Sequence, residues 1–414
     1  MTETLAAPPE AAAGGYRDLL GERDFLFLLG ASFVSRSADF FSYVALAWVT
    51  LDLTHSGAAV ALVIGAQTVT WVAVLLFGGA LADRQTPRRL MARASLGRLL
   101  VTGVLAALIA AHAFNRWELL PAAILLGLAG GLFMPGRQSA LPTVVPPRLL
   151  EAGNGLLQVS FQAATVAGPA IAGLIVARAG SASAFALDAA GYGAAALLVW
   201  LIASRDSAGA GRNKPGGSML QQVGAGLRAA WNDVPLRAIV IVVAVLNFCG
   251  AGPLDVGLAV MARYSWGGAW ALGLVLAGFG AGAVAGALAA GGLRRRPPIG
   301  LAIAAVCIWL AIGLAAFAFI GVIAAFADAV IGGLAIGFIN VVGISWAQRR
   351  TPAEMTGRVM ALISFASLAL NPLSYAVAAP LVAISPPALF AGAGALLLLV
   401  GCGCLLSRRV RAAV

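Results

Sequence analysis

The chain has 414 residues, of which 61% are hydrophobic and only 10% are charged. A water-soluble protein carries about a quarter charged residues, so this composition excludes an ordinary soluble fold. The net charge of +11 could indicate a nucleic-acid partner, but the basic residues are spread over many short loops. Contact with anionic lipid headgroups explains that distribution better, and we expect no nucleic-acid partner.

Twelve apolar segments follow one another along the chain, most of them near or above the ~18 residues that cross a bilayer. We place them at residues 25–50, 58–82, 95–114, 119–141, 153–177, 182–203, 236–262, 269–292, 299–319, 324–346, 359–383 and 387–406. The stretch 299–346 contains no basic residue and is too long for one crossing, so we divide it near Gly321. Ser385-Pro386-Pro387 marks the last boundary, because paired prolines rarely continue a helix.

Lys and Arg residues gather in every second gap between these segments. The exceptions are Arg116, Arg178 and Arg263, in or beside the opposite loops, and Arg36, which we take as the only basic residue deep within a span. This alternation is the positive-inside pattern of a chain that crosses the cell membrane repeatedly with both termini in the cytoplasm. No apolar core followed by a cleavage site opens the chain, so we expect no removable signal peptide.

The polar, glycine-rich stretch 204–235 lies near the middle of the chain and is typical of a cytoplasmic linker. Gly168-Pro169 and Asn371-Pro372 lie 203 residues apart, about half the chain length, which suggests an internal repeat. We therefore predict an all-α membrane protein with twelve transmembrane helices in two pseudo-symmetric six-helix halves. The predicted parts are a cytoplasmic N-terminal segment (1–24), an N-terminal bundle (25–203), the linker (204–235), a C-terminal bundle (236–406) and a cytoplasmic tail (407–414).

The first span carries the most unusual polar stripe. Ser32, Ser35, Arg36, Asp39 and Tyr43 fall on one face of a helix. Asp39 lies ~22 Å in from the cytoplasmic edge at ~1.5 Å per residue, where a charge costs roughly 2.5–3.5 kcal/mol. Arg36 and Asp39 are three residues apart and can neutralise each other, so the pair is either a structural lock or a functional site. In the functional case Asp39 takes up a proton or meets a cationic substrate, with Arg36 tuning its pKa.

The polar content of the spans predicts which of them face lipid. Residues 95–114, 299–319 and 387–406 are almost purely aliphatic, which favours lipid-facing positions. Polar side chains in the other spans are either cavity residues or contacts between helices, and Asp188, Asp255 and Asp328 either carry protons or satisfy helix ends. Our candidates for a substrate cavity or proton coupling, besides Arg36, Asp39 and Tyr43, are Gln67, Trp71, Gln158, Gln162, Asn247, Asp255 and Asn340.

Two further patterns limit the chemistry. Gly278, Gly282 and Gly286 recur every four residues and predict close helix packing. All four cysteines lie in apolar spans, and we find no P-loop, no nucleophile motif and no His/Cys/carboxylate cluster with metal-ligand spacing. We therefore predict neither an enzyme nor a metal or cofactor site, and energy would come from an ion gradient or a partner.

The loop after the second span reads Gly79-Ala80-Leu81-Ala82-Asp83-Arg84-Gln85-Thr86-Pro87-Arg88-Arg89. It resembles the loop 2–3 signature of the major facilitator superfamily, with Thr86 and Pro87 in place of the family's Gly and Arg. By this resemblance Gly79, Asp83, Arg84 and Arg88 would form a cytoplasmic charge lock that holds one gating state.

Three later stretches are similar to the drug:proton antiporter-3 group of that superfamily, which includes macrolide-efflux and enterobactin-exporter-like proteins. They are residues 133–142, 154–158 and 168–173, joined by Thr356-Gly357-Arg358-Val359-Met360. The piece containing Gly168, Pro169 and Gly173 resembles the antiporter motif of exporters.

The resemblance implies a secondary transporter that exports a small amphipathic molecule, such as a drug, antibiotic or secondary metabolite, across the bacterial inner membrane by proton antiport. The expected partners are a small-molecule substrate, protons and the lipid bilayer, and we expect a monomer. Alternatives are a narrow-specificity exporter of a siderophore or biosynthetic product and a lysolipid flippase of the same fold. A membrane scaffold or sensor and a membrane enzyme are further alternatives.

Overall fold

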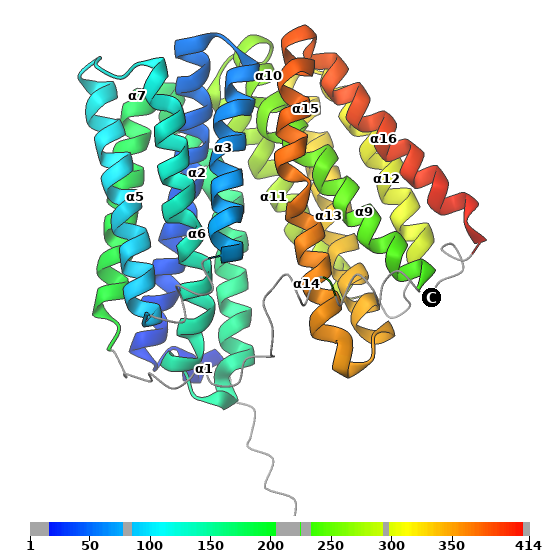
Figure 1. The fold of residues 1–414 in the computed structure, drawn as a ribbon, viewed down its shortest axis with the longest axis horizontal. Helices are drawn as coiled ribbons and strands as arrows, with labels where there is room; N and C mark the ends of the chain where they lie inside the picture. Colours follow the sequence, from blue (N-terminus) through cyan, green and yellow to red (C-terminus); the bar gives the residue numbers. More distant parts are fainter. Residues whose placement is uncertain (1–15, 78–84, 204–223, 225–232, 293–297, 409–414) are drawn as a thin grey trace, which may run out of the picture.

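All elements of the computed structural model are helices, and it describes residues 16–77, 85–203, 224, 233–292 and 298–408 (Figure 1). The helices before the linker are α1 (Tyr16–Leu19), α2 (Arg23–Thr54), α3 (Gly57–Phe77), α5 (Pro87–Ala110), η1 (Arg116–Glu118), α6 (Leu119–Val144), η2 (Pro147–Leu149) and α7 (Leu150–Leu201). Those after it are α9 (Val234–Gly252), η3 (Pro253–Gly257), α10 (Leu258–Tyr264), α11 (Ala269–Gly291), α12 (Ile299–Phe317), α13 (Val322–Arg350), α14 (Ala353–Ala369), α15 (Asn371–Ile384) and α16 (Pro386–Leu406).

Among the described residues, eleven helical stretches are long and apolar enough to cross a membrane. One of them, α7, spans 52 residues and contains Gly180 with φ 79° and ψ 171°. This backbone conformation is readily available only to glycine, and it separates α7 into two crossings. The described residues therefore form the predicted twelve crossings, in two groups of helices that lie side by side in Figure 1.

The helix boundaries follow the breakers in the sequence at two of the places that we predicted. Gly321 precedes α13, and Ser385 separates α15 from α16. The eleventh span, by contrast, is divided at Leu370 into α14 and α15, because Pro372 lies in the first turn of a new helix. At the matching Gly168-Pro169 in the N-terminal half, α7 continues through the proline.

The prediction that residues 95–114 are almost purely aliphatic and face lipid is wrong in one respect. Helix α5 buries Arg98 and Thr102, with Arg98 only 3% exposed. Arg98 is the twelfth residue of α5, about 16 Å from its start. Arg36 is therefore not the only basic residue deep within a span. We had grouped Arg98 with the basic loop that precedes it.

Close glycine contacts hold α11 against α13. A Cβ atom added at Gly282 or Gly286 would lie 1.9 or 2.0 Å from the carbonyl oxygens of Val330 and Leu334. Gly333 on α13 is equally close to Phe279, since a Cβ there would lie 2.0 Å from its carbonyl oxygen. The close packing predicted from the spaced glycines is confirmed, and backbones at this distance leave no room for a side chain.

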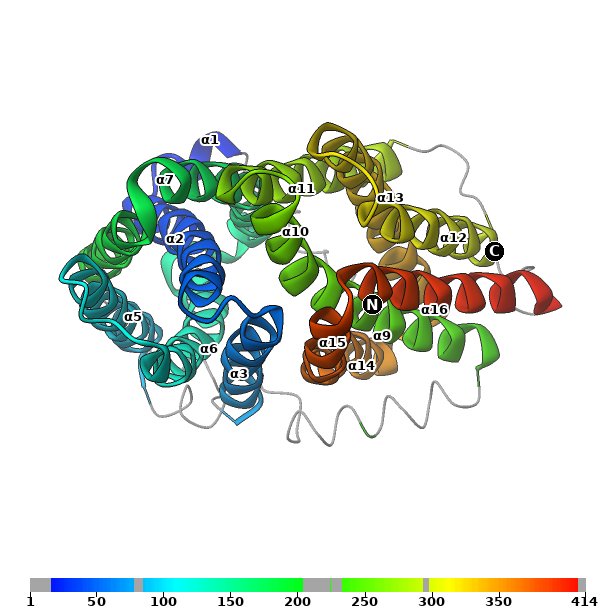
Figure 2. The same cartoon turned by 90° about the horizontal axis from the view of Figure 1, so that it is seen from above.

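The two halves meet along two seams, α7 with α11 and α3 with α15, which lie on opposite edges of the molecule in Figure 2. At the first seam a Cβ on Gly173 would lie 2.6 Å from the carbonyl oxygen of Ala269, and one on Gly273 would lie 2.3 Å from that of Pro169. At the second, Gly65 packs on Tyr375. The antiporter-like residues Pro169 and Gly173 therefore lie in the contact between the halves.

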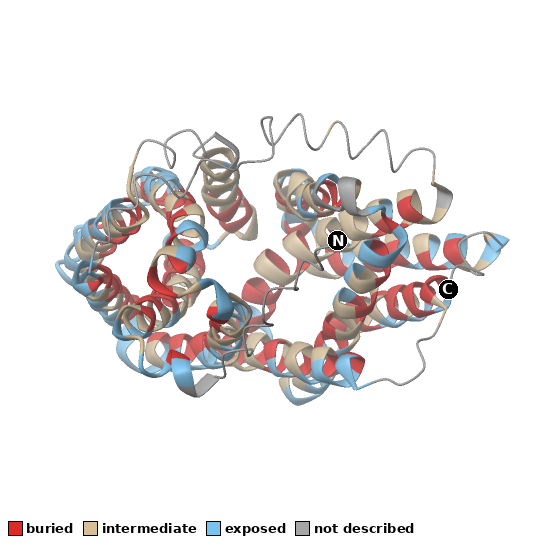
Figure 3. Cartoon of the chain, turned by 90° about the horizontal axis from the view of Figure 1, so that it is seen from below, coloured by how far each residue is buried: buried red, intermediate tan, exposed pale blue. Residues whose placement is uncertain are grey.

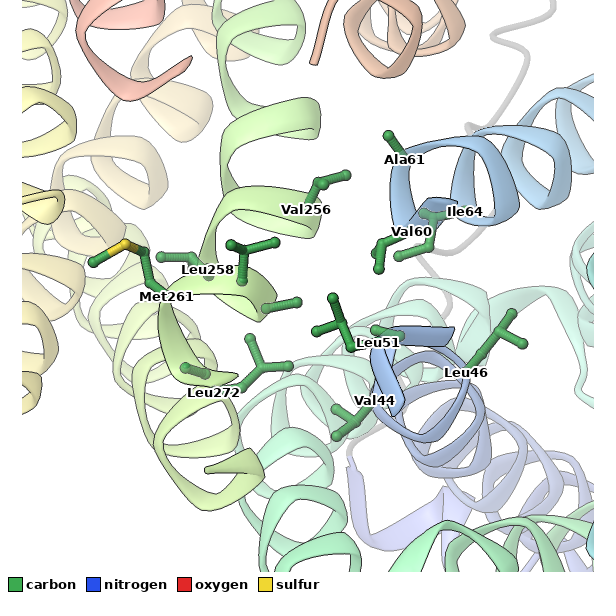
Figure 4. Close-up of a cluster of buried hydrophobic side chains, with 14 of the residues drawn as sticks. Val44, Leu46, Leu51, Val60, Ala61, Ile64, Val256, Leu258, Met261 and Leu272 are labelled. Carbon is green, nitrogen blue, oxygen red and sulfur yellow. The ribbon is translucent and has the colours of Figure 1, made fainter. Parts of the chain in front are cut away.

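We call the end of the molecule at the C-terminus of α2 and the N-terminus of α3 the closed end. There, apolar side chains of α2 and α3 approach those of η3, α10 and α11, including Leu51, Val60, Val256, Leu258 and Leu272 (Figure 4). Buried residues line the inner faces of both helix groups, while many exposed residues lie on the outer surface (Figure 3). Where opening this end would expose the cluster to water, its burial stabilises the contact between the halves by about 25 cal/mol per Å² of apolar area.

Polar contacts reinforce the closed end. Arg263 Nη2 lies 2.8 Å from Asp52 Oδ1, and its guanidinium lies 5.1 Å from the ring centre of Trp48. Tyr264 donates a hydrogen bond to the carbonyl oxygen of His55 at 3.3 Å. Each contact joins α10 to α2 or its C-terminal residue, so opening this end breaks ionic and apolar contacts together.

We expect Gly333→Ala to destabilise the fold on the order of 1–3 kcal/mol, because the added methyl group overlaps a backbone carbonyl of α11. Gly343→Ala, on the same helix with no atom within 4 Å of the added Cβ, is the matched control. Thermal unfolding of the purified proteins measures both. Equal melting temperatures for the two variants would contradict the packing described above.

We expect Gly173→Val to hold the halves apart at the closed end, because the new side chain overlaps the backbone of α11. The readout is the rate at which a maleimide labels Leu51→Cys in a protein otherwise free of cysteine, since Leu51 is fully buried in the closed contact. Gly392→Val, where the added Cβ meets no atom within 4 Å, serves as control. Faster labelling only in the Gly173 variant is expected, and unchanged labelling would show that the seam tolerates the side chain.

Candidate functional site

A cavity of about 450 Å³ lies between the halves, and we call it the central cavity. Its wall comes mainly from α2, α3, α5, α6 and α7, with Asp255, Leu276 and Tyr375 from the other half. Arg36, Asp39, Tyr43, Gln67 and Trp71 from our sequence candidates all line it.

Asp39 lies at the centre of an ionic cluster on this wall. Its Oδ1 accepts hydrogen bonds from Arg98 Nη1 at 2.6 Å and from the Tyr192 hydroxyl at 2.8 Å. Arg36 Nη1 lies farther away, 3.5 Å from Oδ2. The predicted Arg36–Asp39 pair is therefore present, but Arg98 is the nearer cation. Asp39 is 35% exposed, so its carboxyl group is open to the cavity.

Aromatic rings surround both arginines. The Arg36 guanidinium lies 4.6 and 4.5 Å from the ring centres of Phe40 and Phe161. Arg98 lies 5.0 Å from the ring of Phe133 and 4.6 Å from that of Tyr192. Cation–π attraction of this kind is strongest where water is excluded. It helps to stabilise the charges of Arg36 on α2 and Arg98 on α5.

A second carboxyl group lies behind this cluster. Asp188, on the second crossing of α7, is 0% exposed, and the Ser42 hydroxyl donates a short hydrogen bond to its Oδ2. Its Oδ1 has no hydrogen-bond partner among the described residues, and neither do Nε and Nη2 of Arg98. Asp188 interacts electrostatically with Arg98 and with Asp39.

Asp255 joins the halves at the far wall of the central cavity. Tyr43 donates to the backbone oxygen of Asp255 at 2.9 Å and to Oδ1 at 3.3 Å, while Tyr375 donates to Oδ2 at 2.5 Å. Asp255 lies in the π-helical turn η3, which places it between a tyrosine from each half. The amide of Gly252, just before this turn, is satisfied by the Ser374 hydroxyl at 2.8 Å.

A second cavity of about 460 Å³ lies within the C-terminal half and shares Asp255 with the central cavity. Asn247, Asn340 and Asp328 line it, so two more of our candidates face this space instead of the central cavity. No Lys or Arg is among its described lining residues, whereas the central cavity is lined by Arg36, Arg98 and Arg137.

The remaining candidates lie elsewhere. Gln158 is exposed and Gln162 is half-buried, and neither is among the described lining residues of the two cavities. Gly168 packs against Phe40, where an added Cβ would lie 2.7 Å from the ring. Arg88, in the first turn of α5, donates a hydrogen bond to the carbonyl oxygen of Trp200 at 2.5 Å. Gly79, Asp83 and Arg84, like most of the linker at 204–235, lie outside the described residues.

Our sequence reading missed Arg98, Arg137, Tyr192 and Tyr375 as site residues. The available signals were the positions of Arg98 and Arg137, which lie within the predicted spans 95–114 and 119–141. The sequence does not identify the tyrosines as site residues, since a single tyrosine in a span is as compatible with helix packing as with a role in a site. Among the described residues no group of three or more His, Cys, Asp or Glu side chains could hold a metal ion.

Comparison with known proteins places this arrangement in a family. The solved structure of the nucleoside transporter NupG superposes with a TM-score of 0.72 at 13% identity, covering 93% of this chain and 100% of that one. The MFS-type transporter y4rN of Sinorhizobium fredii is 29% identical over 280 residues, 66% of this chain and 67% of the relative. The multidrug efflux pump Tap of Mycobacterium tuberculosis is 26% identical over 371 residues, 86% of each chain. The family model of the Major Facilitator Superfamily matches residues 28–374, and the chain belongs to this superfamily.

Proposed function

We propose that this transporter exports a small amphipathic molecule by proton antiport, with Asp39 as the group that binds and releases the proton. The observation that carries the proposal is the position of Asp39: a carboxylate deep in a span, open to the central cavity and held by Arg98, Tyr192 and Arg36. A charge at that depth is costly, and a proton-binding role accounts for its presence.

The lining of the central cavity supports an amphipathic substrate. Phe40, Trp71, Phe133 and Phe161 offer aromatic faces, while the arginines and Gln67 offer hydrogen-bond donors. The similarity to Tap along 86% of each chain supports export of this kind of compound. One proton moving inward at ~100 mV contributes ~2.3 kcal/mol, enough for a concentration ratio of roughly fiftyfold.

Transport would proceed by rocking of the two bundles, 25–203 and 236–406, about the central cavity. The closed end described above would then form the barrier on the outer side of the inner membrane, with both termini in the cytoplasm. The proposed working unit is a monomer.

We expect Asp39→Asn to abolish pH-gradient-driven efflux, because the amide cannot take up a proton in the relevant range. The measurement is efflux of a panel of fluorescent dyes and antibiotics from proteoliposomes with and without an imposed pH gradient. Glu118→Gln, which removes a half-buried acid from a capping box away from the cavity, should leave efflux unchanged. Wild-type efflux that survives collapse of the proton gradient would rule out antiport.

The proposed orientation predicts the outcome of reporter insertions. Alkaline phosphatase, active only outside the cytoplasm, should be active when inserted after Gly321 and inactive when fused after Ser407. Gly321 precedes α13, and Ser407 follows α16. Three crossings separate the two sites, namely α13, the α14–α15 span and α16, so the sites lie on opposite sides of the membrane. Activity at Ser407 would reverse the assigned orientation.

A further inference from the structure

We propose that Asp188 is the alternate partner of Arg98: when Asp39 takes up a proton, Arg98 turns from Asp39 to the unpartnered oxygen of Asp188. The proposal rests on the proton-coupling role assigned to Asp39 above. It makes Asp188 a positioning residue, because it acts on the coupling step through Arg98 and does not itself line the central cavity.

The starting point is the burial of Arg98. Its side chain is 3% exposed, and its one ionic partner among the described residues is Asp39 at 2.6 Å. Protonation of Asp39 removes that partner's charge. A buried guanidinium left without a carboxylate is strongly unfavourable, and this penalty would oppose proton uptake by Asp39. A second carboxyl group within reach of Arg98 removes the penalty.

Asp188 can be this second carboxyl group, because one of its oxygens is free to accept a hydrogen bond from Arg98. Its Oδ1 is buried with no hydrogen-bond partner among the described residues, and the buried Nη2 and Nε of Arg98 also have none there. The two Arg98 nitrogens can donate hydrogen bonds, and the Asp188 oxygen can accept one. Buried polar atoms are rarely left unpaired, so these three call for an explanation.

The neighbours of Asp188 on each packed element favour the exchange. From α2 it faces Asp39 and the hydroxyl of Ser42, from α5 it faces Arg98, and Tyr192 lies one turn along its own helix. Tyr192 contacts both sides, since its hydroxyl binds Asp39 and its ring lies under the Arg98 guanidinium. Arg98 thus lies over the Tyr192 ring, bonded to Asp39 and close enough to Asp188 to interact with its charge, and the proposed exchange is a side-chain rotation from the first carboxyl group to the second.

The exchange gives Asp39 two stable states. With Asp39 ionised, Arg98 and Tyr192 hold it against the cavity wall. With Asp39 protonated, Arg98 binds Asp188, and the Asp39 side chain is released towards the cavity. The exchange takes up one proton, because Asp39 alone binds it and the proposal keeps Asp188 ionised in both states, with Ser42 donating to its Oδ2 and the Arg98 charge nearby. Proton binding is thereby converted into a change of contacts between α2, α5 and α7, the helices on which a rocking motion of this half depends.

The test needs no substrate. Infrared difference spectra of the purified transporter in liposomes follow the protonated-carboxyl band during a pH titration, and the component lost in Asp39→Asn reports Asp39. In Asp188→Asn we expect the midpoint of this component to move to lower pH by one unit or more, a tenfold weaker proton binding. In Ser42→Ala we expect a move to higher pH, because Asp188 loses a competing donor and attracts Arg98 more strongly.

Two comparisons separate the exchange from a simple loss of nearby negative charge. In an Arg98→Gln background, the Asp188→Asn shift should be much smaller, because only the direct repulsion between the two carboxyl groups remains, whereas a purely through-space effect of charge would persist in full. Ser95→Ala removes a buried hydroxyl of α5 that has no hydrogen-bond partner among the described residues, and it should not change the midpoint.

An unchanged midpoint in Asp188→Asn, or an undiminished shift in the Arg98→Gln background, would overturn the proposal. Thermal unfolding of each variant checks the fold, and if Asp188→Asn does not fold, the sign of the Ser42→Ala shift decides. The proposed function fails separately, by wild-type efflux that is insensitive to the proton gradient. Gradient-driven efflux with an unchanged Asp188→Asn midpoint would overturn the role of Asp188 alone.

Discussion

The arrangement of the N-terminal half depends on one buried cation. Arg98 is almost fully enclosed by α2, α5, α6 and α7, and a guanidinium in such a place needs a carboxylate and aromatic faces around it. Asp39, Phe133 and Tyr192 supply them from three different helices. Because each neighbour comes from a separate crossing, the charge specifies how these helices pack in a bilayer, where apolar side chains alone give little preference.

The two halves solve the packing problem differently although they share a fold. The C-terminal half brings α11 and α13 together by glycine against backbone carbonyl and places no Lys or Arg among the described residues of its cavity wall. The N-terminal half uses an ionic cluster. The described arginines of the cavity walls thus lie in the N-terminal half, and the seam at Gly173 and Gly273 joins the halves through backbone contact.

Most of the fold could be predicted from the sequence, because the bilayer requires long apolar helices and because glycines and prolines mark their ends. Gly321, Ser385 and the Gly278 stripe were identified from these local signals. The ionic cluster could be predicted only in part. Arg36 and Asp39 are neighbours on one helix, so spacing reveals them, whereas Arg98 and Tyr192 reach Asp39 across helices 59 and 153 residues away.

Such contacts depend on how helices rotate against each other, which a periodic pattern does not specify. The same reason explains Tyr43, which we grouped with Asp39 because both lie on one stripe of α2. In the structure the rotation of α2 turns its hydroxyl across the cavity to Asp255 in the other half. That carboxylate is held by Tyr43 from one side and Tyr375 from the other, so separating the halves at this level breaks the Tyr43 bonds and leaves Asp255 with a single tyrosine. The Tyr43 contact therefore opposes separation of the halves. Its contribution depends on how well water or a bound molecule can replace the phenol hydroxyl at that carboxylate.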